Sequence, residues 1–220
     1  MKISTKLVLH LEVLNKNQLD ILNHLRLPSS NFYLAGGTAL ALQIGHRTSI
    51  DFDFYSKNHF DALKLSETLQ EEFPRLEFLF QEEDTLRVKI GETELSFFYY
   101  HYVLLDQLFK LKEIYIASIK DIAAMKIAAI VQRGTKRDFI DMYYLLESYS
   151  LGEIVNFTLE KYPGYQEMLI LRALIYFEDA EIEKYKRQIR TLDPNFSWEE
   201  AKEKIFAEVK KFQLDMIKGK

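Results

Sequence analysis

A glycine pair between two apolar runs, within residues 32–42, constrains the fold more than any other feature of this chain. The first run has the character of a short buried strand. The second, which opens at Thr38, has that of a buried helix. Gly36 and Gly37 permit the sharp turn between them, because glycine adopts backbone conformations that other residues avoid. A helix that begins directly after such a turn presents backbone N–H groups, so this segment is suited to phosphate.

Two carboxylates, Asp51 and Asp53, follow on the next extended segment. Residues two apart on a strand point to the same side, and Phe52 and Phe54 then fill the opposite, apolar face. Two adjacent acids repel each other unless a cation neutralises them, and their natural ligand is a hard divalent metal such as Mg²⁺ or Mn²⁺. An isolated pair of this kind is usually a solvated strand face. Its position after the glycine turn, with Arg47 between as a cation for a polyphosphate, favours nucleotide chemistry.

The composition restricts the class of protein. With 220 residues, 48% of them hydrophobic, the chain can bury a substantial core. It has no cysteine, which excludes disulfides, thiol catalysis and cysteine-ligated zinc. A net charge of −4 argues against indiscriminate nucleic-acid binding. No apolar run approaches the roughly 18 residues that a membrane span needs, so we expect a cytoplasmic protein with no membrane contact.

The hydrophobic pattern changes along the chain, from mixed before about residue 115 to helical after it. In the first part we expect helices over 5–25, 38–42 and 58–73, and strands over 32–35, 49–54, 76–80, 85–90 and 93–99, the last two as a hairpin. In the second part we expect helices over 119–133, 136–147 and 198–218, and another after Ser150. The predicted fold is α+β, with a small mixed-sheet nucleotide-binding core over residues 1–115 and an all-helical region over 116–220.

Lys126 is the only charge within residues 122–132, a stretch apolar enough to predict a largely buried helix. A buried ammonium is unfavourable unless it is paired or faces a polar cleft. Arg133 is expected on nearly the same helical face, and Asp138 and Asp141 on a facing helix can meet these cations. Two interpretations stay open. The cluster is a buried ion-pair network, or Lys126 faces the phosphate cleft while an aspartate orients it or acts as a base.

Residues 34–42, 45–54, 121–130 and 133–141 together resemble the AbiEii/AbiGii-type nucleotidyltransferase toxins of the DNA polymerase β-like superfamily. The resemblance implies a minimal nucleotidyltransferase that acts on a nucleoside triphosphate as a type IV toxin. In that family the glycine motif holds the triphosphate, the acid pair binds Mg²⁺, and a later lysine and aspartate complete the site. The residues carried over are Gly36, Gly37 and Ser49 for the nucleotide and Asp51, Asp53, Lys126 and Asp138 for catalysis, with Asp141 as a further candidate. The residue pattern itself adds Thr38 and Arg47 for nucleotide binding and Arg133 as a further candidate.

One position departs from the superfamily pattern. Many members carry a third carboxylate on a later strand, and Ser96 occupies that position here. Glu94 lies on the same strand face and is the candidate substitute; otherwise Asp138 or Asp141 would act as the base. The departure keeps a second hypothesis open, a catalytically silent relative that binds nucleotide or a partner protein. A glycosyltransferase that uses a nucleotide sugar would explain the acid pair but not the glycine turn.

Some relatives add pyrimidine nucleotides to the acceptor end of tRNA, and their usual partner is a winged-helix antitoxin. The resemblance therefore implies tRNA and such an antitoxin as partners of this chain. The sequence offers one feature that suits RNA, which we term the basic strip: Lys110, Lys112, Lys120, Lys136 and Arg137. Because a polyanion would be attracted to this strip, we expect the acceptor hydroxyl to belong to an RNA end.

Overall fold

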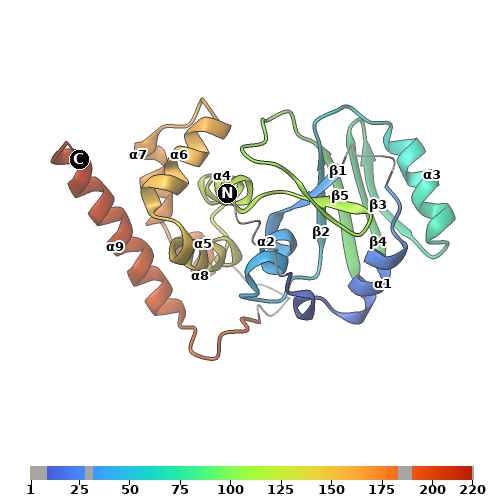
Figure 1. Cartoon of the computed structure of the whole chain (residues 1–220), viewed down its shortest axis with the longest axis horizontal. Coiled ribbons are helices and arrows are strands. Elements are labelled where there is room, and N and C mark those ends of the chain that lie inside the picture. Colours follow the sequence, from blue (N-terminus) through green and yellow to red (C-terminus); the bar gives the residue numbers. More distant parts are fainter. Residues whose placement is uncertain (1–8, 28–31, 183–189, 220) are drawn as a thin grey trace, which may run out of the picture. The chain divides into compact units, whose positions relative to one another are not determined.

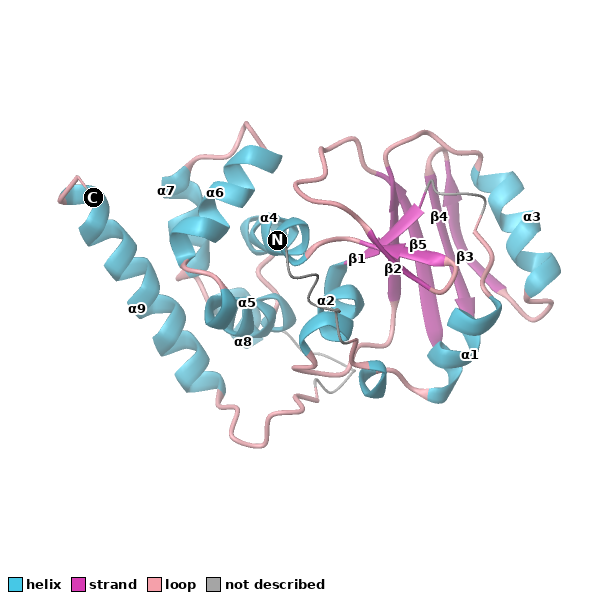
Figure 2. Ribbon diagram, viewed as in Figure 1, coloured by secondary structure: helices cyan, strands magenta, loops and turns pink. Residues whose placement is uncertain are grey.

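The computed structural model describes residues 9–27, 32–182 and 190–219, which form two compact units. The sheet unit comprises Met1–His101 and Leu108–Ala117, and the helical unit comprises Tyr102–Gln107 and Ser118–Lys220. Figures 1 and 2 show the labelled strands gathered in the sheet unit. The predicted α+β class is confirmed. Among the described residues, no helix is long and apolar enough to span a membrane.

The sheet unit is built on one mixed sheet with the strand order β3-β4-β5-β2-β1-β7-β6. β2 lies at the centre of this order, antiparallel to β1 and parallel to β5. The two shortest strands, β6 and β7, have three residues each and were not predicted. The strands are β1 (Phe32–Ala35), β2 (Phe52–Ser56), β3 (Glu77–Glu82), β4 (Thr85–Ile90), β5 (Thr93–Tyr99), β6 (Phe109–Leu111) and β7 (Ile114–Ile116).

The helices of the sheet unit include one correction to the predicted elements. A single helix over 5–25 is wrong, because the described part holds a 3-10 helix, η1 (Leu11–Val13), and then α1 (Lys16–His24). Asn15 separates them, since its side chain accepts from the backbone N–H of Gln18 in a reciprocal capping box. Residues 5–8 lie outside the described part. The remaining helices are α2 (Gly36–Ile44) and α3 (Ala62–Glu72).

The aromatic core of the sheet unit fixes which way β2 faces. Phe52 and Phe54 are fully buried, and the ring of Phe54 stacks on that of Phe97, with centroids 5.1 Å apart. Successive side chains on a strand alternate, so burying these two rings turns Asp53 to the opposite face. The predicted opposition of Phe52 and Phe54 to Asp53 on this strand is therefore confirmed, whereas Asp51 lies just before β2.

The helical unit contains α4 (Ile119–Gln132), α5 (Lys136–Ser148), α6 (Leu151–Lys161), α7 (Glu167–Leu174), α8 (Glu178–Ile182) and α9 (Trp198–Ile217). Its deepest ion pair joins Lys161 to Asp121, at 2.8 Å between two side chains with no exposed surface. Lys161 also donates to the carbonyl of Val103, and Asp121 accepts from the backbone N–H of Leu105. This pair therefore binds the segment Tyr102–Gln107 to α4 and α6, and it satisfies both buried charges.

Candidate active site

Asp53 is placed beside the glycine turn by the register of the sheet. It lies opposite Ala35 of β1 on one side and Ser96 of β5 on the other. Ala35 directly precedes Gly36, the first residue of α2. Gly36 has a φ of +69°, and a Cβ atom there would lie 2.8 Å from Asp53 Oδ2. Both the backbone conformation and this close approach require glycine, so strand register brings the two predicted motifs together.

The first turn of α2 also fixes the segment that carries Asp51. The Thr38 hydroxyl lies 2.8 Å from Ser49 Oγ and is hydrogen-bonded to the backbone carbonyl of Asp51. A hydroxyl has one hydrogen, so Thr38 donates to that carbonyl and accepts from Ser49. The Asp51 carboxylate itself accepts a long hydrogen bond, 3.4 Å, from the backbone N–H of Glu94. Two predicted nucleotide-binding residues thus hold the acid pair in place.

Arg47 lies against the glycine turn, with its side chain largely buried. Its Nη1 donates to the carbonyl of Thr48 at 3.0 Å. A Cβ atom on Gly37 would come within 2.5 Å of Arg47 Nη2. The guanidinium therefore occupies the space that the second glycine leaves open. This places a fixed cation beside the start of α2, whose end already favours anions.

A second arginine, which the sequence reasoning missed, lies on the acidic face of the sheet. Arg87 of β4 is opposite Ser96 in register, and its Nη2 is 2.6 Å from Glu94 Oε1. The hydrogen bond from Arg87 to Glu94 raises the pKa of the Arg87 guanidinium, and the charges of Asp51 and Asp53 raise it further. Arg87 thus carries its charge within reach of three carboxylates. Its signal in the sequence was its place between Leu86 and Val88 on an alternating strand.

The acid pair has the chemistry and exposure that a divalent cation needs. Asp51 and Asp53 are both partly exposed carboxylates beside the glycine turn. Within residues 9–27, 32–182 and 190–219, no group of three or more His, Cys, Asp or Glu could hold a metal ion. Two carboxylates with phosphate and water completing the shell are a common coordination for Mg²⁺. Ser96, the neighbour of Asp53 in register, supplies no third carboxylate.

The Lys126 cluster, which we define as Lys126, Thr135, Asp138 and Asp141, lies within the helical unit. Lys126 Nζ is 2.9 Å from Asp138 Oδ1 and 2.6 Å from Asp141 Oδ2. Thr135, which the sequence reasoning missed, donates to Asp138 Oδ2 at 2.5 Å. All four residues are buried. The predicted meeting of Lys126 with both aspartates is confirmed, and that Lys126 also faces Asp51 and Asp53 stays a prediction.

The protonation of Asp138 reflects two opposed effects. Burial alone would raise the pKa of its carboxyl, but the charge of Lys126 and the hydrogen bonds from Thr135 and Lys126 lower it. The net result is a pKa below the usual value for aspartate. Asp138 is therefore an ionised, hydrogen-bonded partner of Lys126 and a weak proton acceptor at neutral pH.

One prediction about the basic residues needs correction, that for Arg133. α4 ends at Gln132, so Arg133 is its C-cap residue with an exposed side chain and does not share the buried face of Lys126. The basic strip is divided between the units, with Lys110 and Lys112 in the sheet unit and the other three in the helical unit. Several of its charges already have partners. Lys110 pairs with Glu113, Lys120 pairs with Asp106, and Lys136 Nζ lies 4.7 Å from the centroid of the Trp198 ring.

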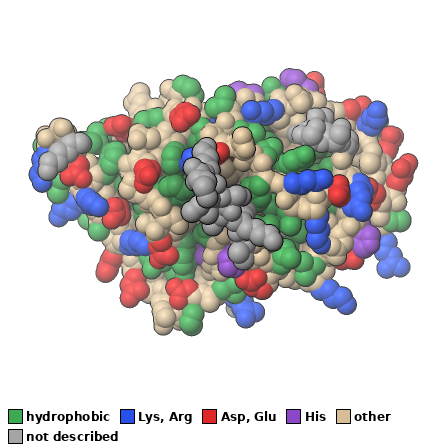
Figure 3. Space-filling view, in the orientation of Figure 1, with side chains coloured by type: hydrophobic (Ala, Val, Ile, Leu, Met, Phe, Trp, Pro, Cys, Tyr) green, Lys and Arg blue, Asp and Glu red, His purple; other side chains and the backbone are tan. Residues whose placement is uncertain are grey.

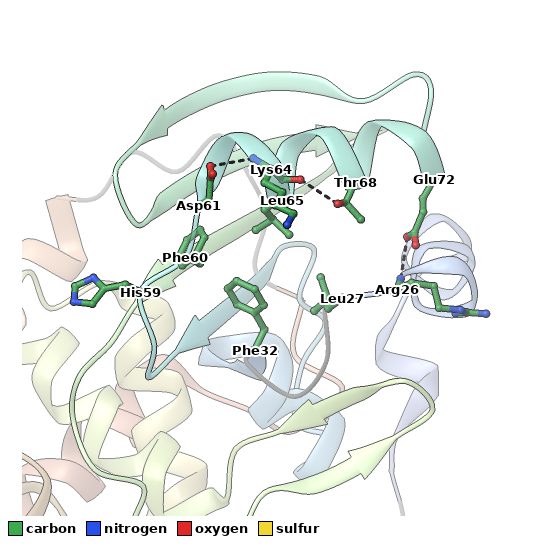
Figure 4. Close-up of a pocket in the computed structure, with 10 residues that line it drawn as sticks. All are labelled: Arg26, Leu27, Phe32, His59, Phe60, Asp61, Lys64, Leu65, Thr68 and Glu72. Atoms are coloured by element: carbon green, nitrogen blue, oxygen red, sulfur yellow. Dashed lines mark hydrogen bonds between the residues drawn. The ribbon is translucent and has the colours of Figure 1, made fainter.

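Another cavity of the sheet unit, of about 480 Å³, contains none of the predicted site residues. Its lining comes from the end of α1, the start of β1 and the residues around α3 (Figure 4). Phe32 and Phe60 form an edge-to-face pair, with centroids 5.0 Å apart, and Glu72 accepts from the backbone N–H of Arg26. The Arg26 guanidinium points away from the other lining side chains in Figure 4. The cavity therefore lacks the carboxylate pair and the glycine turn on which nucleotide chemistry depends.

Comparison with known proteins gives a consistent result. The profile of the family described as nucleotidyl transferase AbiEii toxin, type IV TA system, matches residues 20–211. An uncharacterized Aquifex aeolicus protein is 39% identical over 189 residues, which cover 83% of this chain and 88% of that protein. The crystal structure of a candidate nucleotidyltransferase from Helicobacter pylori has a TM-score of 0.54 at 15% identity, covering 87% of this chain and 90% of that one. The nucleotidyltransferase toxin MenT4 of Mycobacterium tuberculosis has a TM-score of 0.50 at 15% identity, covering 86% and 79%.

Proposed function

This chain belongs to the AbiEii family of nucleotidyltransferase toxins, and we propose that it moves a nucleoside monophosphate from a triphosphate to a hydroxyl of RNA, with Mg²⁺ or Mn²⁺ as cofactor. The observation that supports this proposal is the approach of Asp53 to Gly36, because a carboxylate suited to a divalent cation then lies against a glycine turn suited to phosphate. The triphosphate would lie over Gly36, Gly37 and Thr38 with its anionic end near Arg47.

The proposed reaction is a single displacement at the α-phosphorus. An oxygen of the acceptor hydroxyl bonds to this phosphorus, the bond to the bridging oxygen of the β-phosphate breaks, and pyrophosphate leaves. When bound by Asp51 and Asp53, the divalent cation supplies electrostatic stabilisation of the phosphate oxygens. Arg47 adds a cation beside the glycine turn, so the charge on the departing pyrophosphate is stabilised by groups already held in place.

We assign the hydroxyl proton to Glu94. Its backbone N–H contacts the Asp51 carboxylate, and its side chain lies two residues from Ser96 on the same face of β5. Asp138 is less suited to this step, because its two oxygens already accept from Lys126 and Thr135 and its pKa is lowered. We therefore assign to Asp138 the orientation of Lys126, and to Lys126 a contact with phosphate.

The acceptor and partners follow from the chemistry and the family. A tRNA 3′ end offers a free hydroxyl on a polyanion that suits Lys136 and Arg137 of the basic strip. These substrates place the activity in the cytoplasm, and a winged-helix antitoxin is the proposed partner of the toxin.

The test is transfer of label from each α-labelled nucleoside triphosphate to total tRNA, with Mg²⁺ and with chelator. We expect labelled tRNA that depends on the cation and is absent with Asp51→Asn. Glu203→Gln, an exposed change on α9, is the matched control and should leave transfer unchanged. If protein is labelled in place of RNA, the acceptor is a protein, and the assignment of the chain as a nucleotidyltransferase stands.

A second candidate function rests on Ser96, which stands beside Asp53 where an acid would complete the site. A catalytically silent relative would bind triphosphate without turnover. The same assay separates the two, because that relative would bind a fluorescent triphosphate and label nothing, and Ser96→Asp would then create the transfer that the native chain lacks.

A further inference from the structure

The edge strand β3 presents an unusual surface, independent of the proposed active site. β3 pairs with β4 on one side and ends the sheet on the other. All six of its residues are exposed, and three consecutive ones, Phe78, Leu79 and Phe80, are apolar with 41–54% of their surface in solvent. Exposed apolar edge strands are templates for pairing with another chain, so natural proteins cover or protect them. No described strand covers this edge.

A groove lies beside this strand on the side of α3. It has a volume of about 530 Å³ and is lined by Leu63, Ser66, Phe78 and Gln81, with Glu67, Gln70 and Glu71 at its margin. Leu63 is 56% exposed, so the groove is floored by apolar groups that face solvent. A bulge between Phe78 and Phe80 turns Phe80 toward Arg87, on the other face of the sheet. Phe78 and Leu63 are therefore the two large apolar groups of the groove.

The charge around this surface is negative. Carboxylates of Glu67 and Glu71 flank the groove, and those of Glu77, Glu82 and Glu83 follow the strand. None of these five takes part in a hydrogen bond or ion pair within the residues that the structure describes. Figure 3 shows acidic side chains exposed at the α3 end of the sheet unit. Unpaired carboxylates around exposed apolar groups repel nucleic acid and attract a basic, partly apolar ligand.

We propose that β3 and the groove beside α3 form a docking surface for an extended segment of a partner protein in which basic residues alternate with apolar ones. Such a segment adds a strand to β3 through backbone hydrogen bonds. Side chains on one face of the added strand point to the groove and to Phe78. Its lysines or arginines lie on the other face of the added strand and meet Glu77 and Glu82. A second copy of this chain is a poorer occupant, because it would bring the same five carboxylates to the interface.

The experiment uses the full chain and a fluorescent eight-residue peptide of alternating lysine and valine, capped at both ends. A glutamate–valine peptide of the same length is the reference. We expect the lysine peptide to bind and the glutamate peptide not to bind. The variant Glu77→Lys/Glu82→Lys should reverse this preference, with a change of at least about tenfold for each peptide. The matched control, Glu199→Lys/Glu203→Lys on α9, has the same change of net charge and should alter binding by less than about twofold.

Two further measurements separate strand addition from general attraction of opposite charges. Hydrogen exchange of the backbone amides in residues 77–82 should slow when the lysine peptide is bound. Phe78→Ser, at a position that is already 54% exposed, should weaken binding by about tenfold without unfolding the chain.

The proposal is overturned if the lysine peptide does not bind at millimolar concentration, or if the α9 control changes binding as much as the β3 variant does. Unchanged amide exchange in β3 would overturn it equally. Sedimentation of the free chain as a dimer that Phe78→Ser dissociates would assign the surface to a second copy. None of these outcomes depends on nucleotidyl transfer.

Discussion

Asp51 and Asp53 in the sheet unit and Asp138 and Asp141 in the helical unit lie in different surroundings. In the sheet unit, Asp51 and Asp53 are partly exposed, and Arg87 is bonded to Glu94 beside them. In the helical unit, Lys126 bonds directly to two buried aspartates. Open carboxylates can accept a ligand, whereas buried pairs mainly oppose the cost of their own desolvation. The two pairs of aspartates therefore differ in exposure, since one pair is reached by solvent and the other is enclosed with its cation.

The largest expected effect tests the acid pair, Asp51 and Asp53. Asp53→Asn keeps the size of the side chain while it removes the charge that a divalent cation requires. We expect transfer to fall at least about 10³-fold, the scale seen when a preorganised charged group is removed. The melting temperature should change by a few degrees at most, because Asn keeps the size and hydrogen-bonding shape of the side chain at a partly exposed position. A variant that retains near-native activity would remove Asp53 from the site.

The next largest effect tests the Lys126 cluster. Lys126→Met retains the apolar stem of the side chain and leaves Asp138 and Asp141 buried without their cation. We expect the free energy of unfolding to fall by about 3–5 kcal/mol at pH 7, measured by urea denaturation. Lys120→Met, at an exposed ion pair with Asp106, is the control and should lower the free energy of unfolding far less, because solvent screens an exposed ion pair. Equal stability of the two variants would contradict the structural role.

The pH dependence of that loss has a defined sign. The pKa of Asp138 is lowered in the folded protein, so its contribution to stability is present above the unfolded pKa and is lost as pH falls through the folded value. In Lys126→Met, burial without the cation should raise the pKa of this carboxyl. Protonation of Asp138 then raises the free energy of unfolding of the variant, because it removes an unpaired buried charge. The same protonation lowers the free energy of unfolding of the native protein. The difference in unfolding free energy between the two should therefore narrow as pH falls from 7 toward 4.

The proposed base gives a smaller effect. Glu94→Gln keeps the hydrogen-bonding shape but cannot accept a proton, and we expect kcat to fall about 10²-fold. Arg87→Gln is the companion variant, because it frees Glu94 from its partner without removing the carboxylate. If Glu94 has only a structural role, kcat should fall equally in both variants. If Glu94 is the base, kcat should fall only in Glu94→Gln, and that variant should also lose the acidic limb of the pH profile of kcat.

The glycine turn gives a still smaller loss that couples stability to activity. Gly36→Ala requires alanine to adopt the left-handed backbone conformation, and it brings the Cβ atom against the Asp53 carboxylate. We expect a loss of about 1–2 kcal/mol in unfolding free energy, together with weaker triphosphate binding. Gly164→Ala is the matched control, since a Cβ there meets nothing within 4 Å. Activity that survives Gly36→Ala would mean that the turn does not approach the triphosphate.

The sequence predicted what local patterns encode. The glycine turn, the acid pair and the Lys126 cluster all lie within short stretches whose periodicity fixes which side chains share a face. The break at Asn15 was missed because the apolar spacing continues across it, although the capping box ends one helix and begins the next. Strands β6 and β7 were missed because three residues carry too little alternation.

Contacts between residues far apart in the sequence were also not predicted. Lys161 and Asp121 are forty residues apart and meet only because α4 packs on α6. Arg87 joins Glu94 across a hairpin, but its closeness to Asp51 and Asp53 depends on β5 pairing with β2 in parallel. No spacing rule reveals such pairings, since they follow from strand order and helix packing.

The smallest expected effect concerns the acceptor. Lys136 and Arg137 begin α5, between Thr135 and Asp138 of the Lys126 cluster, and Lys136 Nζ lies over the Trp198 ring. Lys136→Glu/Arg137→Glu should weaken tRNA transfer several-fold and reduce the slope of log affinity against log salt by about two, one unit for each phosphate that is no longer neutralised. Lys210→Glu/Lys211→Glu, at exposed positions of α9, makes the same charge change as a control. Triphosphate binding should be the same in both variants. An equal loss in both would mean that net charge, and not these two residues, attracts the RNA.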